Sequence, residues 1–98
     1  MRFEWDAEKN RRNRAKHKIS FEAAQFVFDD PYALSIRDRI VNGEERWQTT
    51  GRAAGISVLR VVHANREQGG EDVIRIITAR KATPRERRLY EEALKSHY

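Results

Sequence analysis

The sequence predicts an α+β fold in which helices at both ends of the chain pack on one face of an antiparallel sheet. Two stretches with helical features come first, at residues 6–17 and 21–28, and a third begins at Thr83. Between them lie four runs of strand-forming residues separated by short turn signals. Short sequential connections join antiparallel neighbours, so the four runs are expected to form a meander. At 98 residues the chain is long enough for a single domain over residues 1–98 and too short for two.

The N-terminal third is predicted to hold a short strand and two helices. Phe3–Trp5 alternates apolar and polar residues, as a strand does. Asp6 is a good N-cap for a helix that runs to about His17. This helix has almost no large apolar residue, so its inner side must be partly polar, or it must cover only the edge of the sheet. Ser20 can cap a second helix over Phe21–Phe28, where the apolar positions fit helical spacing.

The rest of the chain is predicted to hold the meander and the last helix. Asn42-Gly43 is a tight hairpin signal, and Thr83-Pro84 supplies an N-cap and a proline at the first helical position. The predicted strands are 33–41, 45–52, 56–64 and 73–79, with turns at 51–55 and 68–70.

The charge of the chain favours a nucleic-acid partner. Charged residues make up 36% of the sequence, the net charge is +5, and only five of the 20 basic residues are lysines. The planar arginine fork suits bidentate contact with phosphate, and a strong excess of basic residues is the usual footprint of nucleic-acid binding. The plain alternative is the charged surface of a small domain.

The sequence also indicates where such a protein resides. It has no cysteine, hence no disulfide or thiolate metal site, and no apolar run near the roughly 20 residues that span a bilayer. Its first residues are polar and lack a signal-peptide core. A cytoplasmic protein is expected.

Residues 9–18 form the first of three candidate clusters, with six basic residues and no acidic one. Lys9, Asn13 and His17 are four residues apart and line one face of the predicted helix. A solvated basic helix is the competing interpretation.

Residues 80–88 form the second cluster, with five basic residues and one acidic residue. It spans the end of the last strand and the first helical turn, where free backbone N–H groups favour an anion. Lys81 and Arg85 oppose the helix dipole there, which favours a bound phosphate over a merely solvated helix.

The third cluster lies in a predicted strand. Glu45 and Trp47 point to one face, and Glu44 and Arg46 point to the other. Trp47 either packs in the core or stacks on a base.

Two further arginines, Arg60 and Arg75, interrupt apolar strand runs. Each lies either on a face open to a ligand or beside an acidic residue.

The motifs that are missing restrict the chemistry. The sequence has no Gly-rich phosphate loop or HExxH motif, and its three histidines are far apart, so no metal or other cofactor is predicted. A metal-free enzyme acting on nucleic acid would direct the 2′-hydroxyl of RNA at the adjacent phosphate. That reaction needs a base, cations for the phosphorane charge and an acid for the leaving oxygen.

The motifs resemble those of the BrnT toxin family over about residues 3–90, in the same order. The segments that carry the resemblance are Phe3-Glu4-Trp5-Asp6, Lys9, Asn13, Lys16-His17, Ile19-Ser20-Phe21-Glu22, Gly43-Glu44-Glu45-Arg46-Trp47, Ile74-Arg75-Ile76-Ile77-Thr78-Ala79-Arg80-Lys81-Ala82-Thr83 and Glu86-Arg87.

The resemblance implies a specific function. BrnT proteins are metal-independent ribonuclease toxins of bacterial type II toxin–antitoxin pairs, with a RelE-like fold. The implied partners are an RNA substrate and a BrnA-like antitoxin, whose ribbon-helix-helix part binds DNA.

The matched polar positions imply a site. Arg46 and Arg80 would bind the scissile phosphate. Either His17 or Glu45 would accept the proton, and either Lys9 or His17 would donate one. The predicted RNA contacts are Lys81, Trp47, Arg75 and Arg85.

Two other functions fit the same residues. One is a non-catalytic module that binds nucleic acid through its basic surface. The other is a protein-interaction domain whose basic face meets an acidic partner, which is compatible with a toxin covered by its antitoxin.

Overall fold

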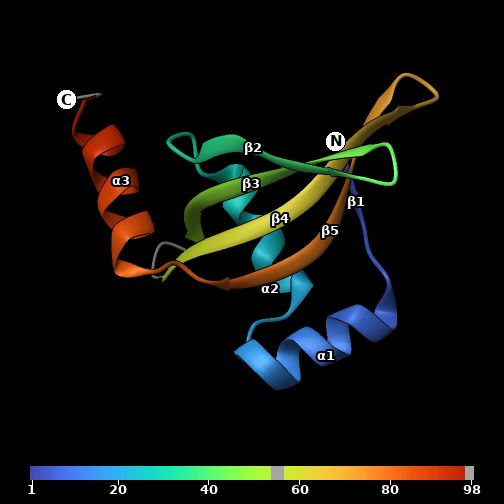
Figure 1. The fold of residues 1–98 in the computed structure, drawn as a ribbon, viewed down its shortest axis with the longest axis horizontal. Helices are drawn as coiled ribbons and strands as arrows, with labels where there is room; N and C mark the ends of the chain where they lie inside the picture. The colour runs from blue at the N-terminus through green and yellow to red at the C-terminus, as the bar shows by residue number, and fades with distance from the viewer. Residues whose placement is uncertain (54–56, 97–98) are drawn as a thin grey trace.

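A twisted five-stranded sheet carries α2 on one face and α1 beside the edge of β5, and helix α3 stands at one end of the sheet (Figure 1). The computed structural model describes residues 1–53 and 57–96. The elements in chain order are β1 (Arg2–Glu4), α1 (Ala7–His17), α2 (Phe21–Ala24), the 3-10 helix η1 (Gln25–Asp29), β2 (Leu34–Val41), β3 (Glu44–Ala53), β4 (Ser57–Gln68), β5 (Glu71–Lys81) and α3 (Pro84–Lys95).

The sheet confirms the predicted meander and adds a strand to it. Strands β2 to β5 pair antiparallel in sequence order. The prediction of four antiparallel strands is wrong in one respect, because β1 pairs with β5 in parallel and makes the sheet mixed. Residue 3 lies opposite residue 74 in this pair, and the Phe3 ring packs on Phe28 in the core. The free edge of β5 is thereby covered at that end.

The turns follow the glycine signals except at Gly51. Asn42 and Gly43 both have positive φ, as the tight β2–β3 hairpin requires. The turn predicted at 51–55 is wrong at residues 51–53, which lie inside β3, and residues 54–56 lie outside the described part. A Cβ at Gly51 would come within 3.1 Å of the Val27 side chain, so glycine lets η1 pack closely on β3.

The second predicted helix is shorter and tighter than expected. After four α-helical residues the chain continues as the 3-10 helix η1 rather than as α-helix to Phe28. The tighter turn buries Val27 completely, while Phe26 remains half-exposed. The core beneath α2 and η1 is formed by Phe21, Val27, Val61 and Ile76 among others.

Helix α1 is attached to the sheet by one polar side chain. Asn13, its only buried residue, donates from Nδ2 to the carbonyls of Ile19 and Ala79 at 2.9 and 2.8 Å. Its Oδ1 accepts from the Ala79 amide at 3.2 Å. Asn13 therefore pairs with the edge of β5 as a strand would, which explains how a helix without an apolar stripe is held.

Helix α3 lies on the opposite side of the sheet from the other helices, so the prediction of one helix-covered face is wrong. Tyr90 packs with Val58 and Ala82, and Val58 alternates away from the core residues of β4. The Tyr90 hydroxyl donates to Asp30 at 2.6 Å, and Arg52 lies over its ring. No helix of residues 1–53 and 57–96 is long and apolar enough to cross a membrane.

Candidate functional site

Four arginines gather on the sheet face that α1 and α2 leave open. In the register of β3, β4 and β5, residue 60 lies opposite 50 and 80, and residue 64 opposite 46 and 75. Side chains alternate along a strand, so the arginines at these positions share one face. We call this cluster the arginine face; it consists of Arg46, Arg60, Arg75 and Arg80 with Glu44 and Glu86.

Glu86 holds two of the arginines from the first turn of α3. Arg80 donates from both terminal nitrogens to its carboxylate at 2.8 and 2.9 Å, a bidentate pair. Arg60 Nε lies 3.5 Å from the same group and donates to Gln48 Oε1 at 2.7 Å. The Arg80 hydrogen bonds lower the pKa of Glu86 from 4.5 to about 2 and raise that of Arg80. Both groups are therefore charged at neutral pH.

Glu44 holds the other two arginines. It forms a short ion pair with Arg75, and its Oε1 lies 3.7 Å from Arg46 Nε. Arg46 Nε is buried and has no hydrogen-bond partner among the described residues. Leaving such a donor unsatisfied costs about 1–3 kcal/mol, which an oxygen of a bound anion would recover.

The arginine face carries an excess of positive charge in fixed positions. Four arginines face two glutamates, and only 19–36% of each arginine side chain is exposed. Partial burial strengthens electrostatic interactions with a ligand, and the glutamates fix the guanidinium groups before it binds. The arrangement suits a phosphate that gains charge during a reaction.

Lys9 and His17 lie on α1, beside β5. Both line a cavity of about 260 Å³ between α1 and β5, together with Ile77 and Thr78. Thr78 is two residues before Arg80 and on the same side of β5. The structure thus places the two predicted acid–base candidates in one cavity, which the four arginines of the arginine face do not line.

Glu45 and Trp47 lie on the other face of the sheet. Arg37 Nη2 is 3.4 Å from Glu45 Oε2, and the Arg37 guanidinium lies 5.7 Å from the centre of the Trp47 ring. The structure therefore separates both from Arg46, and the carboxylate beside Arg46 belongs to Glu44.

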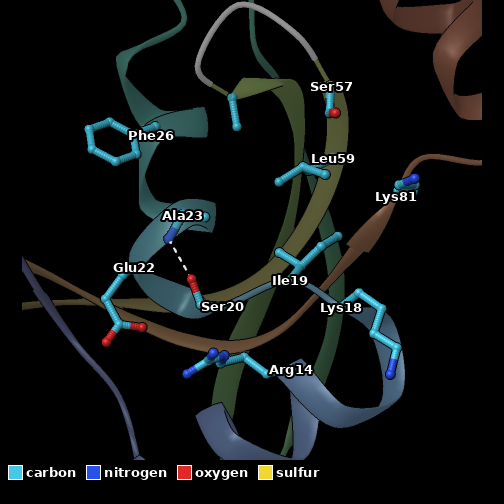
Figure 2. A pocket seen from close by; sticks show the side chains of 11 residues that line it. Arg14, Lys18, Ile19, Ser20, Glu22, Ala23, Phe26, Ser57, Leu59 and Lys81 are labelled. Atoms are coloured by element: carbon cyan, nitrogen blue, oxygen red, sulfur yellow. Dashed lines mark hydrogen bonds between the residues drawn. The ribbon is translucent and has the colours of Figure 1, made fainter.

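Lys81 and Arg85 also lie apart from the arginine face. Arg85 is exposed on the first turn of α3. Lys81 alternates to the helix-covered side, where it reaches the rim of a cavity of about 760 Å³ (Figure 2). We call this cavity the helix-side groove. Its main lining residues are Arg14, Lys18, Ile19, Phe26, Leu59 and Lys81.

Of the remaining histidines, His63 is structural and His97 lies outside the described residues. His63 is 2% exposed, with Nε2 2.7 Å from Thr49 Oγ1 and Nδ1 2.7 Å from Asn65 Oδ1. Burial lowers the pKa of His63, so the ring is neutral. Among the described residues, no three side chains of metal-binding type cluster.

Three members of the arginine face were not predicted as site residues: Arg60, Glu44 and Glu86. Arg60 carried a signal, since it interrupts an apolar strand run. Glu44 could have been recognised because it is two residues before Arg46 in the same strand and therefore points to the same face. Glu86 gave no separate signal, because its position in the sequence is already explained by the capping box of α3, in which it accepts a hydrogen bond from the Thr83 amide.

Comparison with known proteins gives one family and one fold. Residues 5–86 match the family described as the ribonuclease toxin, BrnT, of type II toxin–antitoxin systems. The fold is similar to the 1.1 Å crystal structure of the Brucella abortus ribonuclease toxin BrnT, with a TM-score of 0.59 and 22% sequence identity. That match covers 85% of this chain and 97% of the Brucella chain. No match was found among curated protein sequences.

Proposed function

The chain belongs to the BrnT family of ribonuclease toxins, and from that premise we propose that it is a metal-independent endoribonuclease that cleaves RNA on the arginine face. The observation that carries the proposal is the set of four arginines fixed by two glutamates on one open face. Such an array can bind a phosphodiester and stabilise the additional negative charge of its transition state.

The arginines provide the phosphate site. Arg46 offers a buried Nε with no hydrogen-bond partner among the described residues, and Arg80 offers a planar fork now occupied by the Glu86 carboxylate. A carboxylate and a phosphate present similar pairs of oxygens, so the substrate can take the place of Glu86 on Arg80. Arg60 and Arg75 add positive charge on either side.

The reaction transfers one proton at each end of the scissile bond. The ribose 2′-oxygen attacks phosphorus as a base removes its proton, and the 5′-oxygen leaves with a proton from an acid. The products carry a 2′,3′-cyclic phosphate and a 5′-hydroxyl. Since Glu45 lies on the other face, we assign His17 as the acceptor and Lys9 as the donor, both from the cavity beside Thr78.

The family also defines the cellular setting of the proposal. A type II toxin has a protein antitoxin, and we propose a BrnA-like antitoxin with a ribbon-helix-helix part, acting with the toxin in the cytoplasm. Cleavage of cellular RNA would arrest growth until the antitoxin neutralises it.

Incubation of the purified chain with RNA in EDTA tests the activity. The proposal expects cleavage, with 2′,3′-cyclic phosphate ends identified by mass spectrometry. Binding without cleavage would instead support the non-catalytic module. Activity that is lost in EDTA and restored by a divalent metal would contradict the metal-independent mechanism.

A further inference from the structure

The helix-side groove has the features of a protein-docking site, and it lies across the sheet from the arginine face. We propose that it binds an acidic segment of the antitoxin, with an apolar side chain of that segment inserted between α2 and the start of β4. The identity of this partner rests on the proposed toxin function. The binding surface itself rests on the lining, the charge and the extent of the groove.

The lining of the groove is apolar where a partner would insert. Ile19 and Leu59 point into it beside Ala23 in Figure 2, and Phe26 stands at its side. Phe26 is 49% exposed, whereas the other three phenylalanines are buried or half-buried in the core. An exposed aromatic beside an apolar hollow of about 760 Å³ is the pattern of a binding hot spot.

The rim of the groove carries basic side chains that form no close ion pair within the described residues, although the charge of Arg14 helps to lower the pKa of Glu22. Arg14 and Lys18 come from the end of α1, and Lys81 comes from the end of β5 (Figure 2). Within the described residues none of the three forms an ion pair, in contrast to every member of the arginine face. Three cations around an apolar floor are complementary to an apolar side chain flanked by acidic residues.

An acidic protein segment fits this groove better than RNA does. The apolar part of its lining is aliphatic except for one aromatic ring, Phe26, so it offers bases little to stack on. Glu22 also stands at the edge, where the side-chain hydrogen bond from Asn10, at 2.8 Å, lowers the pKa of its carboxyl. A carboxylate held in its charged form repels an RNA backbone that follows the rim. A peptide can avoid this charge, because its own charges need not repeat at every residue.

The groove continues towards the arginine face. A second cavity of about 200 Å³ shares Ser57 and Lys81 with it and extends to Arg52 and Arg87 beside α3. A chain seated at Phe26 can therefore pass over Lys81 and reach α3, which carries Glu86. This route allows docking on one side of the sheet to bring the antitoxin to the arginine face on the other.

The test uses the full chain and, as the probe, the purified antitoxin encoded beside the toxin gene. The double variant Phe26→Asp/Lys18→Glu places repulsive charge in the groove. We expect its Kd for the antitoxin, measured by calorimetry, to rise at least about 30-fold, with RNA cleavage unchanged. The matched control is Ile40→Asp/Arg39→Glu, which makes the same kinds of change at exposed positions of β2, away from this route, and should bind as the wild type does.

Circular dichroism verifies that the variants fold. If the first double variant does not fold, the milder Phe26→Ala/Lys18→Gln replaces it, with an expected loss of antitoxin affinity of about 10-fold. Wild-type affinity in the groove variant would overturn the proposal. Loss of RNA cleavage with antitoxin binding retained would overturn it also, because the groove would then be an RNA site. Calorimetry does not depend on cleavage, so a chain that fails to cut RNA would refute the ribonuclease and leave the docking result valid.

Discussion

The arginine face and the helix-side groove are both basic, but they hold their charge in opposite ways. On the arginine face each guanidinium group is ion-paired with Glu44 or Glu86. In the groove Arg14, Lys18 and Lys81 surround an apolar floor, and within the described residues none of them forms a close ion pair. The first arrangement fixes the guanidinium groups by ion pairs, and the second sets positive charges around an apolar surface.

The difference shows that net charge alone does not identify a site. Fixed, partly buried cations can stabilise charge that develops at one point, as a reacting phosphate requires, because they need not reorganise during the reaction. Cations around an apolar hollow favour a partner that buries apolar surface there and carries acidic side chains of its own. We therefore assign chemistry to one basic region and docking to the other.

The largest expected effect is the loss of cleavage when a fixed arginine is removed. Arg80→Ala should lower the rate of RNA cleavage by about 10²–10³-fold, the usual cost of one transition-state donor, with the fold retained. Quantification of the 2′,3′-cyclic ends measures it. Arg39→Ala, at an exposed position of β2, is the control. If both variants cut RNA equally well, the two basic regions no longer differ in chemistry.

The second prediction concerns the anchor of that arginine. Glu86→Gln retains a side chain that can cap α3 but removes the charge that holds Arg60 and Arg80. We expect the free energy of unfolding at pH 7 to fall by at most about 3 kcal/mol, from the lowered pKa of Glu86. Urea denaturation measures it, and Glu92→Gln on the exposed side of α3 serves as the control.

The same ion pair predicts a pH dependence. The folded-state pKa of Glu86 is lowered from 4.5 to about 2, so its contribution is complete above pH 4.5 and is lost as the pH falls towards 2. The wild type should therefore lose more stability across this window than Glu86→Gln does. Identical acid profiles would show that Glu86 does not fix the arginines.

A smaller effect is expected where α3 is attached to the sheet. Tyr90→Phe removes the hydroxyl that donates to Asp30 at 2.6 Å and should cost about 1.5 kcal/mol of unfolding free energy. Hydrogen exchange should show faster opening of α3 while α1 and α2 keep their protection. Uniform acceleration over the whole chain would mean that α3 has no separate attachment.

The smallest effect is expected on the other face. Arg37→Ala removes the ion pair with Glu45 and the contact with the Trp47 ring, and it should cost about 0.5–1 kcal/mol. Thermal unfolding measures the cost, and RNA cleavage should stay at the wild-type rate. A marked loss of cleavage would place this face in the site.

Local signals in the sequence were sufficient for most of the fold. The hairpin at Asn42-Gly43 and the caps at Asp6, Ser20 and Thr83 were predicted correctly, because each depends on neighbouring residues. The parallel pairing of β1 and the side of the sheet taken by α3 were not. Both depend on contacts between distant residues, such as Tyr90 with Asp30, which no periodicity reveals.

The site was predictable to the extent that strand alternation decides it. Alternation placed Glu44 and Arg46 on one face and Glu45 and Trp47 on the other, but it did not indicate which pair lies on the open face. The resemblance then favoured Glu45, which the structure places on the other face, ion-paired with Arg37. Glu86 could not be recognised, since a capping box explains it fully until the strand that carries Arg80 is placed beside it.

Arginine side-chain NMR tests the central claim most directly. A 2′-O-methyl RNA oligonucleotide binds without being cleaved, and its addition should shift the Nε–Hε signals of Arg46, Arg60, Arg75 and Arg80. The signals of Phe26 and Lys18 in the helix-side groove should stay in place. Shifts confined to the groove, with the four arginine signals unmoved, would contradict the assignment of RNA chemistry to the arginine face.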